Sequence, residues 1–175
     1  MQSGIESLSR WIEAVLAVLL IGLMLAVVLQ VLGSAFDVNP ILSLAEPAAL
    51  VGRAVTLNSL LDLQWHLLVI VGLIPAGLVW QRDRHVRVDF LYQRYDVRWR
   101  AKVDLAGNLL FAAPFFLLIL PASWSFMMRA WRSDEGSRNG GLEDLWLIKS
   151  VLPLGLGILA VYILLESLRL MHARR

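Results

Sequence analysis

The sequence predicts an all-α integral membrane protein with four transmembrane helices. Of its 175 residues, 58% are hydrophobic and only 17% are charged, whereas charged residues make up about 25% of soluble domains. Three stretches contain no charged residue, and they cover residues 14–36, 63–81 and 105–128. Because a helix rises 1.5 Å per residue, about 20 apolar residues cross a hydrocarbon core about 30 Å thick. A fourth run, 150–165, is shorter but is flanked by a lysine and a glutamate, whose side chains can reach the headgroups.

We therefore expect a single domain over residues 1–175. The expected spans cover about residues 12–35, 63–81, 103–127 and 148–168. The first span could instead be a cleaved signal peptide. Its apolar run is longer than an h-region of about 7–15 residues, and no convincing small-residue cleavage site follows it, so we favour an uncleaved helix. The absence of cysteine excludes disulfides, thiolate metal sites and cysteine catalysis.

The distribution of positive charge predicts the orientation. Seven of the 16 Lys and Arg residues lie in one connection, residues 82–102, and the C-terminal tail carries three more. Lys and Arg close to the ends of spans mark the cytoplasmic side. We therefore expect both termini in the cytoplasm, with the connections 37–62 and 129–149 facing outward.

The basic connection also carries an apolar stripe at helical spacing. Its members are Val88, Leu91, Tyr92, Tyr95 and Trp99. This pattern predicts a short amphipathic interfacial helix between the second and third spans, with aromatic rings at headgroup depth and arginines near anionic lipid. The alternative is a solvated loop with scattered aromatic residues. Asp96, which lies in the same connection, is a plausible N-cap for the third span.

The two outward connections carry fewer signals of local structure. In 37–62, Asn39-Pro40 is typical of a turn, and a short surface helix is expected from Pro47, with Leu50, Val51, Ala54 and Val55 on one face. The stretch RSDEGSRNGG in 129–149 is typical of a flexible polar turn. Both connections either receive a soluble partner or only connect spans.

Proline and small residues mark positions where the spans could bend or approach one another. Pro75, Pro114 and Pro121 are expected to kink their helices. Gly72 and Ala76, four residues apart, would permit close approach of a second helix.

Ionisable side chains occur near the ends of the spans and not at their centres, although the centre is where ion paths and proton relays need them. Asp62 and His66, like Asp104 and Asn108, are four residues apart and share a helix face. Such pairs either contact a partner helix or serve as caps and interface contacts, and the same alternatives hold for Lys149. A single histidine near a span excludes a two-histidine haem site within the chain, and no nucleotide-binding fingerprint occurs. We expect no catalytic, cofactor or metal residues and no nucleic-acid partner.

Four stretches carry a family resemblance. They read LQWHLL at 63–68, DRHVRVDFLYQRY at 83–95, DLAGNLLFAAPFF at 104–116 and GGLEDLWLIKSVLPLG at 140–155. Together they resemble the DctQ-like small membrane subunit of tripartite ATP-independent periplasmic (TRAP) transporters. The resemblance covers about residues 10–170 and is closest to the mannitol/chloroaromatic branch.

The resemblance implies a four-helix subunit of the bacterial inner membrane that is not an enzyme. Its partners would be a large multi-span subunit, which carries the sodium and substrate sites and moves as an elevator, and a periplasmic binding protein that delivers an organic acid. The small subunit would enlarge the static scaffold. The candidate partner-interface or membrane-placement residues are Trp65, His66, His85, Arg87, Asp89, Asp104, Asn108, Trp146 and Lys149.

Two other functions compete with the scaffold. A membrane anchor of a redox enzyme would hold quinone or haem together with partner subunits, and the single His66 argues against it. An autonomous small exporter would require a charged residue that faces a pore.

Overall fold

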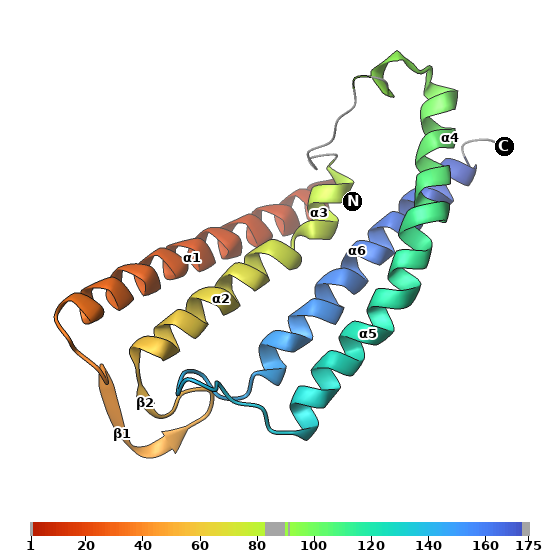
Figure 1. The fold of residues 1–175 in the computed structure, drawn as a ribbon. Helices are drawn as coiled ribbons and strands as arrows, with labels where there is room; N and C mark the ends of the chain where they lie inside the picture. Colours follow the sequence, from red (N-terminus) through yellow and green to blue (C-terminus); the bar gives the residue numbers. More distant parts are fainter. Residues whose placement is uncertain (1, 83–89, 91, 173–175) are drawn as a thin grey trace.

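The computed structural model describes the backbone of residues 2–82, 90 and 92–172, with side chains from Arg10 onward (Figure 1). Four helical segments in this part are long and apolar enough to cross a membrane. They cover Arg10–Ala35, Leu57–Gln81, Val97–Arg132 and Trp146–His172. The predicted four-span architecture is therefore confirmed, and each predicted span lies within one of these segments.

Two of the spans are continuous helices and two contain a break. The helical elements are α1 (Gln2–Ala35), α2 (Leu57–Leu73), α3 (Ala76–Gln81), η1 (Tyr92–Arg94), α4 (Val97–Gly107), η2 (Asn108–Ala112), α5 (Ala113–Arg132) and α6 (Trp146–His172). The second span consists of α2 and α3. The third consists of α4, the π-helical turn η2 and α5.

The breaks and starts of the helices follow from particular residues. Pro75 separates α2 from α3, as expected of a residue that lacks an N–H donor. The π-helical turn ends two residues before Pro114, and there the Ala113 N–H reaches back five residues to the Asn108 carbonyl. The predicted cap is also present, because the Asp96 side chain accepts a hydrogen bond from the Trp99 N–H at 2.9 Å.

The connection between α1 and α2 is a β-hairpin, so the predicted surface helix from Pro47 is wrong. Strand β1 (Leu42–Ala48) pairs antiparallel with β2 (Gly52–Val55). Leu50, in the turn between the strands, and Gly52, the first residue of β2, have φ angles of 69° and 66°. A right-handed helix cannot include such angles. Pro47 is tolerated in β1 because that strand has one neighbour only, so the missing N–H can lie on the free edge.

The predicted interfacial helix falls mainly on residues 83–89 and 91, which lie outside the described residues, so it stays a prediction. The described part nearby contains the single 3-10 turn η1, followed by α4. The end of α3 and the start of α4 lie at the same end of the molecule as the start of α1 and the end of α6, and the hairpin lies at the opposite end (Figure 1). We call these the inner end and the outer end.

The four spans form one open layer in the order α1, α2, α6, α5 (Figure 1). Helix α6 lies inside the layer, where it contacts α2 and α3 on one side and α4 and α5 on the other. No more than 11% of the residues in the most apolar stretch of any span are buried. The layer therefore has no enclosed core, and both of its faces present apolar side chains.

Two glycines lie in close contact between α6 and the second span. A Cβ on Gly155 of α6 would lie 2.9 Å from the Leu73 Cβ and 3.0 Å from its carbonyl oxygen, and one on Gly77 of α3 would clash with the Tyr162 ring. By contrast, nothing lies within 4 Å of such an atom on Gly72. The expected close approach at Gly72 is therefore wrong, since this residue points away from the neighbouring helix.

Candidate partner interface

At the outer end, hydrogen bonds join the two outward connections into one unit, which we call the outer junction. The Thr56 hydroxyl donates to the Gly140 carbonyl at 2.8 Å, and the Asn58 amide donates to the Asn139 carbonyl at 2.6 Å. The other two bonds are from the Leu142 N–H to the Asp62 carboxylate at 3.0 Å and from the Glu143 N–H to the Leu50 carbonyl at 2.7 Å. The stretch predicted to be a flexible turn is therefore fixed to the hairpin and to the start of α2.

Side chains around Lys149 close the outer end of the α5–α6 pair. The Lys149 ammonium lies 2.5 Å from the Glu135 carboxylate and 4.4 Å from the centre of the Phe126 ring. The rings of Trp131 and Trp146 meet edge to face with centroids 4.4 Å apart. Charged and aromatic groups of α5, α6 and the connection between them thus contact one another at the outer end.

The inner end is joined by separate polar contacts. The Tyr92 hydroxyl donates to the Asp104 carboxylate at 2.6 Å. The Asn108 amide donates to the Ser167 hydroxyl of α6 at 2.9 Å. An ion pair of 2.6 Å between Arg82 and Glu13 links the end of α3 to α1.

The candidate residues therefore do not converge on a single site. Lys149 and Trp146 lie at the outer end, and His66 bonds through its ring to the Asp62 carbonyl at 2.5 Å. Asp104 and Asn108 lie at the inner end. Trp65 on α2 is exposed, whereas His85, Arg87 and Asp89 lie outside the described residues.

Sequence reasoning missed the residues that complete the outer junction. Thr56 and Ser59 form a reciprocal capping box at the start of α2, and a serine or threonine three residues before a second polar side chain is a recognisable signal for one. Asn58 and Asn139 of this junction, and Glu135 beside it, carry no such local signal, because their partners are distant in the sequence.

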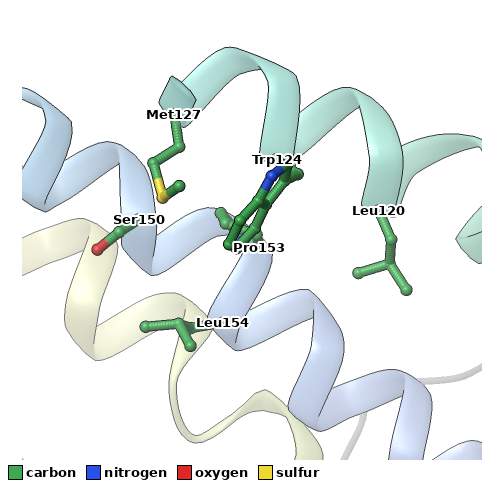
Figure 2. A pocket seen from close by; sticks show the side chains of 6 residues that line it. All are labelled: Leu120, Trp124, Met127, Ser150, Pro153 and Leu154. Carbon is green, nitrogen blue, oxygen red and sulfur yellow. The ribbon is translucent and has the colours of Figure 1, made fainter. Parts of the chain in front are cut away.

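One face of the layer is hollowed between α5 and α6. The groove, with a volume of about 370 Å³, is lined by Leu120, Trp124 and Met127 of α5 and by Ser150, Pro153 and Leu154 of α6 (Figure 2). A second hollow shares Pro153 and Leu154 and continues along α6. Among the residues that the structure describes, no group of three or more His, Asp or Glu side chains could hold a metal ion.

Comparison with known protein families identifies the family to which the chain belongs. A family model described as "Tripartite ATP-independent periplasmic transporters, DctQ component" matches residues 48–173. The chain belongs to the DctQ family. No curated protein sequence matches the chain significantly.

The match places this DctQ-family chain among membrane components of TRAP transporters. It begins at the end of β1 and runs to the end of α6, so it includes three of the four spans and most residues of both ends described above. The resemblance to the TRAP small subunit is thereby confirmed. Assignment to the mannitol/chloroaromatic branch stays a prediction.

Proposed function

We propose that the chain is the static scaffold subunit of a TRAP transporter of the bacterial inner membrane. It would brace the large membrane subunit during sodium-coupled uptake of an organic acid that a periplasmic binding protein delivers. Membership of the DctQ family supports the assignment to this transporter class.

The observation that carries the scaffold role is the open, two-faced layer of spans. A path for a carboxylate needs polar or charged lining, but no Asp, Glu, Lys or Arg occurs in 14–36, 63–81, 105–128 or 150–165. A layer with almost no buried side chains is instead suited to lie flat against a larger helical body. Helices associate in a membrane through close packing rather than through exclusion of water. The groove between α5 and α6 offers a surface into which side chains of a partner could pack.

The contacts at the two ends support rigidity, which a brace requires. The outer junction fixes α2 to the α5–α6 connection, and the glycine contacts hold α6 closely against α2 and α3. The excess of basic residues at the inner end favours a cytoplasmic location for that end and for both termini.

Reconstitution of the transporter tests this function. The large subunit would be placed in liposomes with and without this chain, under an inward sodium gradient, together with the binding protein and the organic acid that most strongly stabilises that protein against heat. We expect co-purification of the two membrane subunits, and uptake only when both are present. Full-rate uptake by the large subunit alone would refute the scaffold role, as would uptake into liposomes that contain this chain only.

A further inference from the structure

We propose that one face of α4 binds the headgroup of an anionic phospholipid in the inner leaflet. This α4 basic-aromatic face consists of Arg98, Trp99, Lys102 and Val103. The inference is independent of substrate and of transport activity, and it concerns which lipids surround the subunit.

The third span is much longer than a membrane is thick. It covers 36 residues, from Val97 to Arg132, through α4, η2 and α5, which corresponds to about 54 Å at 1.5 Å per residue. Its uncharged part, residues 105–128, accounts for about 36 Å, enough for the hydrocarbon core of about 30 Å. The preceding eight residues therefore extend into the headgroup layer and just beyond it.

The other polar groups of this segment are already engaged within the chain. Arg100 donates to the carbonyls of Gln93 and Tyr95 at 2.7 and 2.9 Å. The two carboxylates are also occupied, because Asp96 caps α4 and Asp104 accepts from a tyrosine hydroxyl. These contacts hold α4 against the preceding turn η1, and the α4 basic-aromatic face remains exposed.

That outward face carries two cations, Arg98 and Lys102. Arg98 and Lys102 are four residues apart, so they share a helix face and repel each other. Both are exposed, and no carboxylate in the described part of the chain pairs with either. A phosphate between them would replace this repulsion with two attractive contacts.

The aromatic member favours a lipid over a soluble anion. Trp99 is 58% exposed, and the Lys102 ammonium lies 4.5 Å from the centre of its ring. Val103, 42% exposed, continues the face toward the hydrocarbon. A tryptophan at headgroup depth, beside cations and above an apolar stripe, matches a ligand that has an anionic head and an acyl chain.

The absence of native cysteine allows a local measurement. Ala106 is exposed one turn below Lys102, so Ala106→Cys would carry a fluorophore directly beneath the proposed headgroup. The full chain would be placed in nanodiscs of phosphatidylcholine with a small fraction of nitroxide-bearing lipid, either phosphatidylglycerol or phosphatidylcholine. The measured quantity is the preference for phosphatidylglycerol, given by the ratio of the two quenching efficiencies.

We expect a clear preference for phosphatidylglycerol, lowered about fivefold for each cation removed in the Arg98→Gln and Lys102→Gln variants. Arg98→Lys combined with Lys102→Arg should retain the preference, because the charges remain. A charge-matched control, Arg53→Gln with Arg138→Gln in the outer connections, should also retain it.

Three results would overturn the proposal. The first is equal quenching by both lipids in the unmodified background. The second is an equal loss of preference in the control variant, which would indicate non-specific attraction. The third is loss of quenching by both lipids when the large subunit is bound, since the α4 basic-aromatic face would then be covered by protein.

Discussion

The Asp62 carboxylate accepts a hydrogen bond of 3.0 Å from the backbone N–H of Leu142, a residue 80 positions further along the chain. Leu142 is only 9% exposed, so water cannot readily replace the carboxylate. A Cβ on the neighbouring Gly141 would collide with the same carboxylate. This contact therefore sets how closely the α5–α6 connection lies against α2.

Removal of the Asp62 carboxylate should destabilise the protein. Asp62→Ala leaves the Leu142 N–H without a partner and should lower the free energy of unfolding by about 2 kcal/mol, measured by titration of mixed micelles with a denaturing detergent. Asp62→Asn keeps an acceptor oxygen and should lose less. Glu46→Ala removes an exposed acid of β1 at the same end and is the control. Equal effects of Asp62→Ala and Glu46→Ala would contradict the structural role of Asp62.

Two neighbouring glycines of α6 should respond differently to alanine. Gly155→Ala places a methyl group 2.9 Å from the Leu73 Cβ, and overpacking of this kind lowers the free energy of unfolding by about 1–3 kcal/mol. Gly157 has nothing within 4 Å of the added atom, so Gly157→Ala should be neutral or stabilising by up to about 1 kcal/mol. The same denaturing titration measures both. A loss at Gly157 as large as that at Gly155 would argue against the order of helices in the layer.

The ion pair of Lys149 and Glu135 should show a measurable coupling energy. Its two side chains are 17% and 37% exposed, so solvent screens the pair incompletely. In a double-mutant cycle with Lys149→Met and Glu135→Gln, we expect about 1 kcal/mol of coupling. The pair of Arg82 and Glu13, 41% and 54% exposed, is the control and should give about 0.5 kcal/mol or less. A reversed order of the two coupling energies would be inconsistent with the burial in the structure.

Single cysteines in this cysteine-free chain should report its orientation. Asn139→Cys lies in the outer junction and keeps the backbone carbonyl that accepts a hydrogen bond there, and Gln93→Cys lies at the inner end. In intact cells, a membrane-impermeant maleimide should label Asn139→Cys and should label Gln93→Cys only after permeabilisation. The opposite pattern would show that both termini lie outside the cytoplasm.

Features that depend on composition or on one local residue could be predicted from the sequence. The four spans follow from runs of apolar residues, the cap from Asp96 and the break in the second span from Pro75. In each case the cause lies within a few residues of its effect. The predicted surface helix from Pro47 was wrong because it was based on the helical spacing of apolar residues alone. That spacing does not reveal the left-handed turn that Leu50 and Gly52 adopt.

Features that depend on distant residues could not be predicted. Every span is apolar nearly all around, so periodicity does not reveal which face meets a neighbour, and the central position of α6 had no sequence signal. Of the candidate residues, Asp104 and Asn108 were predicted to share a face, but their partners Tyr92 and Ser167 lie on different elements. The outer junction was missed because each of its four bonds uses a backbone N–H or carbonyl group, and such groups leave no mark in the sequence.

The interior place of α6 has a consequence for biogenesis. Helix α6 follows the other three spans in the sequence, and it contacts both α2 and α5, so the α1–α2 pair is synthesised before its second neighbour. The full layer can therefore assemble only after α6 has been synthesised, because α6 lies between the α1–α2 pair and α5.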